Sequence, residues 1–427
     1  MIIKTKYTLR LLTVTDRKFW LFMGSGLIVS TAYMDPGNWG TNIAAGANFE
    51  YKLLWVIWLA SGMAMMFQYL SGKIGIAGYS LTELVKDKLK NKSLIVSYWL
   101  LAEFVILATD LAEFLGIVVA LKLLFGIPLI WGTYIAVADV LLILLLTQKR
   151  FRSLEGAFVL FVSVIGLGFI YEVFLAKPNL SSILIGSVKP ILTTKSALIA
   201  VGIIGATVMP HALFVHSWLI KNKVIGFNNG GNKTDKKTTL KYHKAENIIS
   251  LTIAAFINAA MLIMAAAAFF GLGDKVATLE GAYVTLIPLF GGFAALVFAL
   301  ALLAAGISSS ITGTLAGQSV MDGLVGFKIP LWIRRIITRV INVIPLTVAI
   351  VLGFEPLKLL VYSQVILSLL IPLPLIPLLM FTANKEIMGD ELVNKKGTTI
   401  LASIFGVIIL GFNSYLLYLF FIKGVSL

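Results

Sequence analysis

The sequence contains no cysteine, only three histidines and few charged residues. Without cysteine the chain forms neither disulfides nor thiolate metal sites, and the redox compartment stays open. Asp, Glu, Lys and Arg make up 13% of the 427 residues, far below the roughly 25% of soluble proteins. Because 59% of the residues are hydrophobic, the composition predicts an integral membrane protein.

Long apolar runs follow one another along the chain. A bilayer core about 30 Å thick requires about 20 apolar residues per helix. We therefore expect an all-α membrane protein with eleven spans, near 20–45, 52–80, 93–121, 127–147, 153–176, 198–221, 245–272, 286–320, 331–353, 357–383 and 398–422. These spans leave no room for a soluble domain. The basic segment before them lacks the apolar core and cleavage site of a signal peptide.

The net charge of +15 comes mainly from clustered lysines and arginines. The clusters lie in the N-terminal segment and at 86–92, 149–152, 221–244, 334–335 and 395–396. All fall on one side of an eleven-span topology, so the positive-inside rule predicts a cytoplasmic N-terminus and an extracellular C-terminus. The other side is not free of basic residues, since Lys177, Lys189 and Lys195 lie there. We interpret the excess of basic residues as a signal of membrane orientation rather than of nucleic-acid binding.

The first and sixth apolar runs are each interrupted by a proline beside potential cation ligands. The interruptions read Asp35-Pro36-Gly37-Asn38 and Met209-Pro210-His211. Proline frees a backbone carbonyl, which lipid tolerates only where the opened backbone lines a cavity. Paired breaks of this kind in two halves of a chain indicate the substrate site of a secondary transporter.

The two breaks also divide the chain into two units of five spans. Because five is odd, the second unit is inverted in the membrane, although the halves show no convincing residue-by-residue similarity. We expect a cytoplasmic segment at 1–19, a first repeat at 20–176, an extracellular loop at 177–197, a second repeat at 198–383 with a flexible cytoplasmic loop at 222–244, and a loop with an eleventh helix at 384–427.

The residues at the breaks suit a divalent transition metal. Asp35 offers a hard anionic oxygen and Asn38 a neutral one, and a carboxylate at membrane depth marks an ion or proton pathway by default. The alternative for Asp35 is a helix cap. The thioether of Met209 suits transition metals rather than Mg²⁺ or Ca²⁺, whereas most methionines in apolar helices only pack.

The histidines give a less specific signal. His211 and His216 lie five residues apart, so they do not form the i, i+4 pair of a zinc site. His211 follows the break and is placed to take up a proton near neutral pH. The alternative for both is a buried histidine that is hydrogen-bonded to a neighbouring helix.

The third span carries Glu103, Asp110 and Glu113 on one helix face. Lipid does not accommodate such a stripe, so we expect it to face the protein interior. The candidate cationic partners are Lys223, Arg334, Arg335 and Arg339. The stripe is either a static salt-bridge ladder or a proton exit route.

Together these motifs resemble the Nramp family of proton-coupled divalent-metal transporters. The matching segments are AYMDPGN at 32–38, ATDLAEFLG at 108–116, MPH at 209–211, HS at 216–217, SITGTLAGQ at 310–318, RR at 334–335, SQ at 363–364 and LS at 367–368. The resemblance implies a LeuT-like fold of two inverted five-helix repeats plus an eleventh helix, with spans one and six discontinuous.

The resemblance also implies roles for individual residues. The metal ligands are Asp35, Asn38, Met209 and the carbonyls of Ala32 and Ala206, with Gln364 approaching the ion in outward-facing states. The proton pathway comprises Asp35, His211, Glu103, Asp110, Glu113, Lys223, Arg334 and Arg335. Gating or supporting residues are Pro36, Gly37, Thr109, Pro210 and His216. The chain departs from the family pattern at Ala212, Ile307 and Lys223, which we expect to affect selectivity and proton stoichiometry.

The function predicted from the resemblance is import of Mn²⁺ and Fe²⁺, and also Co²⁺, Zn²⁺ and Cd²⁺, with proton cotransport by alternating access. We expect a monomer in the cell membrane, without a cofactor, an enzymatic activity or a nucleic-acid partner. One alternative is a carrier or uniporter for Mg²⁺ or other hard cations, against which Met209 argues. Two further alternatives are a membrane metalloenzyme and a metal sensor. The sequence disfavours the enzyme because it contains no His-Glu-x-x-His pattern, and it disfavours the sensor because it shows no appended signalling domain.

Overall fold

The computed structural model describes residues 17–141, 151–229, 235–272 and 279–423, and within these ranges it contains helices and turns but no strand. The helices of the first half are α2 (Arg17–Phe22), α3 (Ser25–Ala32), α4 (Pro36–Phe49), α5 (Leu54–Ala77), α6 (Leu81–Leu89), α7 (Lys92–Phe125), α8 (Leu129–Ala136), α10 (Phe151–Ala176) and α11 (Leu180–Val188). Those of the second half are α12 (Thr194–Val208), α13 (Pro210–Asn229), α14 (Lys236–Phe269), α15 (Leu279–Phe290), α16 (Gly292–Val320), η2 (Met321–Val325), α17 (Leu331–Val351), α18 (Pro356–Leu370), α19 (Pro372–Ala383), α20 (Lys385–Leu392) and α21 (Lys396–Phe421).

Local sequence signals set the ends of the long helices. The side chain of Asn91 caps α7 by accepting hydrogen bonds from the backbone N–H groups of Ser93 and Leu94. The helix ends at Gly126, whose φ of 68° lies in the left-handed region that favours glycine. Ser80 and Glu83 form a reciprocal capping box at the start of α6.

Among the described residues, 8 helices are long and apolar enough to cross a membrane. They are Leu54–Ala77, Lys92–Phe125, Gly156–Ala176, Thr194–Gly226, Lys236–Phe269, Gly292–Val325, Pro356–Ala383 and Lys396–Phe421. Two predicted spans miss this criterion for physical reasons, since the first is divided into α3 of 8 residues and α4 of 14, and α17 carries three buried arginines. The fourth lies partly outside the described residues, which contain a shorter apolar helix at Leu129–Leu141.

Two predicted span boundaries are wrong, each because a glycine ends a helix. The first span does not begin at residue 20, since α2 ends at Phe22 and Gly24, with a φ of 146°, turns the chain into α3. The eighth does not begin at residue 286, since Gly291, with a φ of 90°, separates α15 from α16. In each case the apolar run continues through the glycine, so hydrophobicity alone gave no sign of the break.

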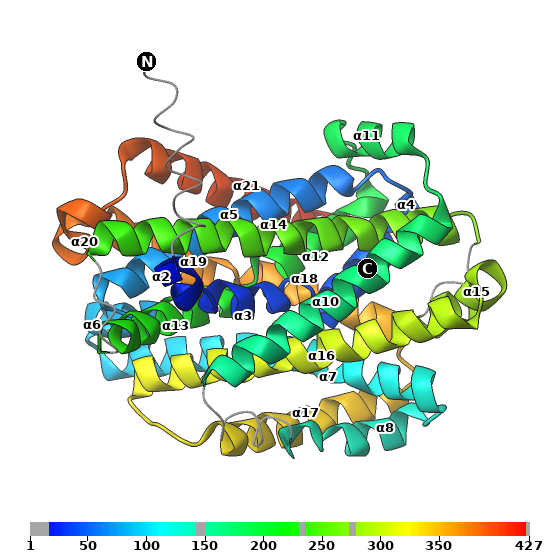
Figure 1. Ribbon diagram of the computed structural model, residues 1–427, viewed down its shortest axis with the longest axis horizontal. Coiled ribbons are helices and arrows are strands. Elements are labelled where there is room, and N and C mark those ends of the chain that lie inside the picture. Colours follow the sequence, from blue (N-terminus) through cyan, green and yellow to red (C-terminus); the bar gives the residue numbers. More distant parts are fainter. Residues whose placement is uncertain (1–16, 142–150, 230–234, 273–278, 424–427) are drawn as a thin grey trace.

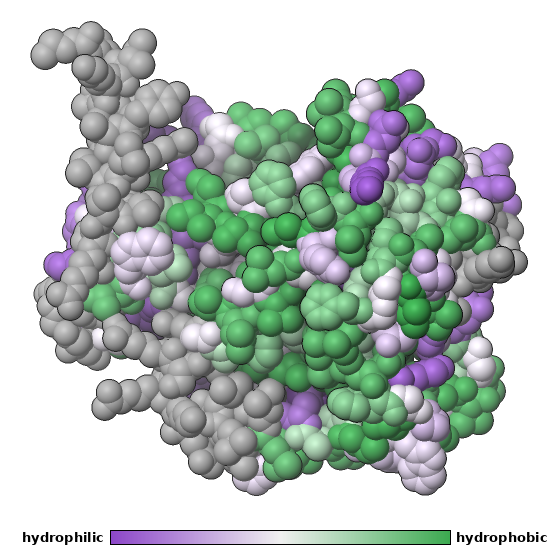
Figure 2. Space-filling model, turned by 45° about the vertical axis from the view of Figure 1, so that its right-hand side comes forward, coloured by the Kyte–Doolittle hydropathy of each residue, from purple (hydrophilic) through white to green (hydrophobic). Residues whose placement is uncertain are grey.

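Helices α2, α6 and α20 lie at one end of the bundle, and α11 and α15 lie at the other (Figure 1). We call these the α6 end and the α11 end. The broken helices α3/α4 and α12/α13 run through the interior between them, and their breaks lie near mid-length. Figure 2 shows a broad hydrophobic surface across the middle of the molecule, as a bilayer requires, with hydrophilic residues gathered toward the right-hand margin.

Candidate metal site and the charged network beside it

The break between α3 and α4 is capped by Asp35. Its Oδ1 accepts hydrogen bonds from the backbone N–H of Asn38 at 2.7 Å and from Asn38 Nδ2 at 2.8 Å. The other oxygen, Oδ2, is buried and has no hydrogen-bond partner among the described residues. The carboxylate therefore caps α4 with one oxygen and keeps the second available for a ligand.

The second break is centred on Met209, whose φ of 44° is unusual for a residue with a side chain. Such backbone strain persists only where the surrounding structure enforces it, and it gathers at functional sites. The side chain of Met209 is fully buried. Pro210 follows as the first residue of α13, so α12 and α13 meet end to end at an opened turn.

Proline explains why two particular carbonyls lack their usual helical hydrogen bond. In a regular helix the carbonyl of residue i accepts from the N–H of residue i+4, but residue i+4 is Pro36 for Ala32 and Pro210 for Ala206. The carbonyl of Ala32 instead accepts from the backbone N–H of Asp35 at 3.2 Å. The carbonyl of Ala206 accepts from Asn38 Nδ2 at 3.0 Å. Asn38 thus joins the two breaks directly, and the predicted carbonyl ligands are the ones that proline frees.

The meeting point of the breaks has unsatisfied oxygens. Asn38 Oδ1, like Asp35 Oδ2, is buried and without a partner in the part of the chain that the structure describes. Buried polar atoms are almost always hydrogen-bonded, so these two oxygens are positions where a water or an ion can be bound. No cluster of three His, Cys, Asp or Glu side chains occurs among the described residues, and a site here depends on Asn, Met and backbone oxygens beside its one carboxylate.

Gln364 of α18 packs between the two broken helices. A Cβ atom on Gly37 would lie 2.0 Å from Gln364 Nε2, and one on Gly205 would lie 1.9 Å from the Gln364 carbonyl oxygen. The Oε1 atom of Gln364 is buried and unpartnered within the described ranges. Gln364 therefore lies against the first break, and its approach to the ion in outward-facing states stays a prediction. Gly205 was missed by the sequence reading, because its role arises only from this packing.

His211 is held against α7 by Thr109. Its Nδ1 lies 3.1 Å from the hydroxyl of Thr109, which itself donates to the carbonyl of Val105 at 3.0 Å. A hydroxyl has one proton, so Thr109 accepts from Nδ1–H and leaves the lone pair on Nε2. That Nε2 is buried and has no partner within the part of the chain described here. Thr109 therefore positions the imidazole of His211, and the role of His211 as a proton acceptor stays a prediction.

His216 lies on a hydrogen-bonded chain that leads to the first break. Its Nδ1 is 2.7 Å from Gln68 Oε1, and Gln68 Nε2 donates to the hydroxyl of Tyr33 at 2.8 Å. The carbonyl of Tyr33 accepts from Asn258 at 2.6 Å. These contacts fix the backbone between α3 and α4, so the structure gives His216 a supporting contact to the break.

The first two carboxylates of the third span pair with arginines of α17. Glu103 forms an ion pair with Arg334, and Asp110 forms ion pairs with Arg335 and Arg339. The Nδ2 of Asn342 donates to the second oxygen of Asp110 at 2.8 Å. Three of the four cationic candidates from the sequence are therefore partners of this stripe.

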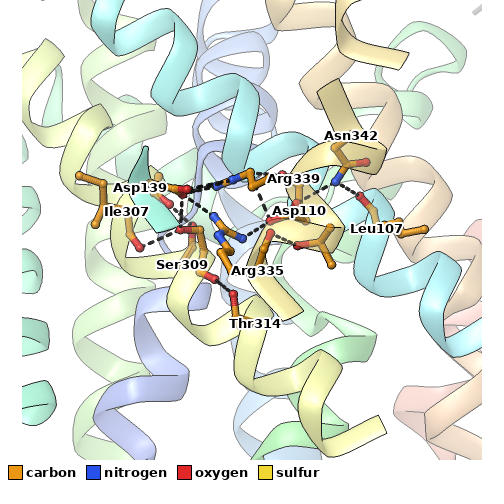
Figure 3. A network of polar contacts seen from close by, with 12 residues as sticks. Leu107, Asp110, Asp139, Ile307, Ser309, Thr314, Arg335, Arg339 and Asn342 are labelled. Carbon is orange, nitrogen blue, oxygen red and sulfur yellow. Dashed lines mark hydrogen bonds and ion pairs between the residues drawn. The ribbon is translucent and has the colours of Figure 1, made fainter. Parts of the chain in front are cut away.

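Asp139 completes this network, and sequence reading missed it. Its carboxylate lies 2.6 Å from Arg335 and 2.6 Å from Arg339, opposite Asp110 (Figure 3). Asp139 is the one charged residue in the predicted fourth span, 127–147. A lone carboxylate in an apolar run was the available signal, and it would have predicted a buried partner.

Glu113 differs from the other two carboxylates of the stripe. It is fully buried, and neither of its oxygens accepts a hydrogen bond from any residue in the described ranges. It packs against bare glycine backbone of α16, where a Cβ on Gly313 would lie 2.8 Å from Oε2. One turn further along α7, Gly116 admits the ring of Pro36, so Glu113 lies close to the first break.

Lys223 has contacts with the N-terminal helix. Its Nζ donates to the carbonyl of Met23 at 2.7 Å and lies 5.9 Å from the ring centre of Phe22. These contacts anchor α13 to α2. The proton-pathway role expected for Lys223 stays a prediction.

Known proteins resemble this chain over nearly its whole length. The family model described as natural resistance-associated macrophage protein-like (Nramp) matches residues 26–419. The chain is 42% identical over 404 residues to the divalent metal cation transporter MntH of Deinococcus radiodurans, covering 94% of this chain and 90% of that protein. It is 44% identical over 403 residues to MntH of Yersinia pestis, covering 92% and 94%.

Solved structures agree in fold. The manganese transporter of Eremococcus coleocola superposes with a TM-score of 0.83 at 32% identity, covering 96% of this chain and 90% of that chain. The nucleobase-cation-symport-1 family transporter Mhp1 superposes with a TM-score of 0.60 at 13% identity, covering 93% and 88%, which shows the fold alone. The chain therefore belongs to the Nramp family, a family of transporters rather than enzymes, and has the LeuT-like fold of inverted five-helix repeats.

Proposed function

We propose that this protein is a secondary transporter that imports Mn²⁺ and Fe²⁺, and also Co²⁺, Zn²⁺ and Cd²⁺, together with protons by alternating access. The observation that carries the proposal is the meeting of two broken helices around the unpartnered oxygens of Asp35 and Asn38, beside the buried thioether of Met209. The names of the relatives, divalent metal cation transporter and manganese transporter, support the substrate class.

The donor set explains the choice of metal. Asp35 supplies the negative charge, and Asn38 and the carbonyls of Ala32 and Ala206 supply neutral oxygens. Such a set replaces part of the hydration shell of a divalent ion. The sulfur of Met209 adds preference for transition metals over Mg²⁺ and Ca²⁺, because a thioether is a soft ligand. The alternative of a hard-cation carrier does not explain this sulfur, because Mg²⁺ and Ca²⁺ prefer oxygen ligands.

The burial of these residues supports alternating access. Asp35 and Asn38 are each 1% exposed and Met209 is 0% exposed, so an ion reaches them only after helices move. The opened turns at Tyr33–Asp35 and Met209 are the places where α3 can move relative to α4 and α12 relative to α13. Gln364, wedged between these helices, is the residue of α18 that such a movement shifts first.

The proton pathway runs along α7. Asp35 and the free Nε2 of His211 accept the proton near the metal site, and the neighbouring Glu113 receives it. From Glu113 to Glu103 the helix advances ten residues, about 15 Å, toward the α6 end. The paired charges of Asp110 and Arg335 line that route, and Glu103 with Arg334 lies at its exit.

The sidedness and division of the chain complete the proposal. The α6 end carries the basic loops near 86–92 and 395–396, so the positive-inside rule makes it cytoplasmic and the C-terminus extracellular. The proposal includes the domain bounds expected from the sequence, with repeats at 20–176 and 198–383. It also includes a monomeric protein that needs no cofactor.

Reconstituted liposomes that contain an internal pH dye test this function. We expect Mn²⁺ uptake that far exceeds Mg²⁺ uptake and that acidifies the interior. Mn²⁺ uptake without acidification would make the protein a uniporter, and equal uptake of Mg²⁺ would favour the hard-cation carrier.

A further inference from the structure

A cavity of about 600 Å³ lies between α5, α14 and α21. Its size falls within the range of about 300–1,000 Å³ that is typical of small-molecule sites. Its walls come from the halves of α14 and α21 that are nearer the α6 end and from Gly62 to Lys73 of α5, and residues of the metal site do not line it. The proposed transport cycle therefore does not account for it.

Positive charge gathers at the mouth of this cavity. Lys73, Lys244 and Lys395 line it, together with a single acid, Glu391. Glu391 is already within 3.6 Å of Lys237. Among the described residues, no carboxylate lies within ion-pair distance of the three lining lysines. The mouth therefore carries an excess of positive charge that no anion of the described chain compensates.

Lys73 is the most informative of the three lysines. It is 3% exposed, and its ammonium donates to Asn394 Oδ1 at 2.6 Å and lies 5.6 Å from the ring centre of Tyr69. These neutral partners orient the ammonium at the turn before α21 without neutralising it. A buried cation without a counter-ion is costly, which favours an anionic occupant beside it.

The start of α21 adds further donors at the same place. Its N-cap is Lys395, which makes no side-chain capping hydrogen bond, and Thr398 in its first turn lines the cavity. The backbone N–H groups of Thr398 and Thr399 donate to the carbonyl of Lys395 at 2.9 and 3.1 Å, so the donors that this 26-residue helix offers an anion are the N–H groups of Lys396 and Gly397. Uncapped helix N-termini bind phosphate and other anions.

The part of the cavity farther from the α6 end is apolar and about one leaflet long. On α21 the lining runs from Lys395 to Phe405, ten residues or about 15 Å, and on α5 from Lys73 to Gly62, eleven residues or about 16 Å. Half of a hydrocarbon core is also about 15 Å. The lining between these ends includes Met66, Ile248 and Leu401.

We propose that this cavity binds an anionic phospholipid of the inner leaflet. The phosphate lies among Lys73, Lys244, Lys395 and the start of α21, and an acyl chain follows the apolar wall toward Phe405. Basic pockets between transmembrane helices at a cytoplasmic surface bind such headgroups. The assignment to the inner leaflet rests on the proposed orientation of the α6 end. Lipid binding itself does not depend on metal transport.

The test measures the melting temperature and native mass spectrum of the purified full-length protein with three additives. The additives are phosphatidylglycerol, phosphatidylcholine and inorganic phosphate. We expect phosphatidylglycerol alone to raise the melting temperature by several degrees and to remain bound in the mass spectrum. Equal effects of the two lipids would overturn the proposal. So would a full shift with inorganic phosphate, which would indicate a site for free anions.

Matched variants locate the site. Lys244→Gln with Lys395→Gln should lose the phosphatidylglycerol shift, whereas Lys88→Gln with Lys90→Gln, which removes the same charge from exposed residues of the α6 end, should keep it. Retention of the shift in the first pair would contradict the headgroup assignment.

Substitution of a glycine tests the apolar part of the cavity separately from the lysines. Gly62 lines the cavity, and a Cβ atom there meets nothing within 4 Å, so Gly62→Leu fills the apolar part without a backbone clash. It should abolish lipid retention, while Gly411→Leu, also in open space, should not. Unchanged retention in Gly62→Leu would overturn the acyl-chain assignment. Metal uptake is not the readout, so failure here leaves the proposed function standing.

Discussion

The two buried polar regions of this protein treat their charges in opposite ways. At the meeting of the broken helices, Asp35 and Asn38 each keep an oxygen without a partner among the described residues. Some turns away, Asp110 and Asp139 enclose Arg335 and Arg339 in a closed set of ion pairs. The open set is suited to an ion that arrives and leaves, and the closed set is suited to joining α7, α17 and the segment around Asp139.

Removing the charge of Asp35 should have the largest effect on transport. Asp35→Asn keeps a good N-cap for α4 but leaves a divalent ion with neutral ligands only. We expect Mn²⁺ uptake in liposomes to fall to background while the melting temperature stays near that of the parent. Asp35→Ala should lose transport as well and also about 1 kcal/mol of stability from the lost cap. Substantial Mn²⁺ uptake by the Asn variant would remove the distinction between the two regions.

Removing Arg335 should have the largest effect on stability. Arg335→Met leaves Asp110 and Asp139 with only Arg339 in a buried setting, and breaking a buried ion pair costs about 3–5 kcal/mol. The matched control is Lys122→Met, which breaks the half-exposed pair with Glu280 and should cost less than about 1 kcal/mol. Thermal unfolding of both variants measures the difference. Similar losses would show that the network does not hold the helices together.

The carboxylates on α7 should differ in what their substitution changes, with Glu113 affecting proton movement and Asp110 affecting both proton movement and stability. Glu113 has no ion pair within the described ranges, so Glu113→Gln should leave the melting temperature and Mn²⁺ binding nearly unchanged while metal-driven acidification falls. Asp110→Asn should lower both acidification and stability. Internal pH and unfolding measured on the same preparations separate the two. If both amide variants move protons as the parent does, the stripe is a salt-bridge ladder.

A smaller effect is expected where Gln364 packs on the first break. Gly37→Ala places a methyl group 2.0 Å from Gln364 Nε2, and such overpacking costs about 1–3 kcal/mol. The double variant Gly37→Ala with Gln364→Ala removes the clash and should recover most of the lost stability. A double-mutant cycle on melting temperature gives the coupling, and additive losses would argue against this contact.

The sequence predicted those features that single residues determine. Proline at 36 and 210 accounts for both helix breaks, which the sequence predicted from these residues. The carbonyls of Ala32 and Ala206 were implied instead by the resemblance to the family, and their role as metal ligands stays a prediction. Arg334 and Arg335 were found because a carboxylate stripe in lipid requires cations. The helix ends at Gly24 and Gly291 were missed, because the apolar runs pass through both glycines.

Other features depend on residues far apart in the chain. Glu246 of α14 accepts hydrogen bonds from the backbone N–H groups of Gly24 and Gly26 and so caps α3 from another helix. The packing of Gln364 on Gly205 is of the same kind. No local sequence pattern encodes such contacts. Asp139 differs, because a lone carboxylate in an apolar span is a local signal of a buried partner.

X-ray absorption spectroscopy of the Cd²⁺-loaded protein tests the central claim that the two breaks together form the metal site. We expect one sulfur neighbour besides oxygen or nitrogen in the parent. We also expect its loss in Met209→Leu, which conserves volume at a cost below about 1.5 kcal/mol. The same variant should bind Cd²⁺ about tenfold more weakly, a difference of about 1.4 kcal/mol, with a smaller change for Mn²⁺. A parent spectrum without sulfur, or one that Met209→Leu leaves unchanged, would contradict the account.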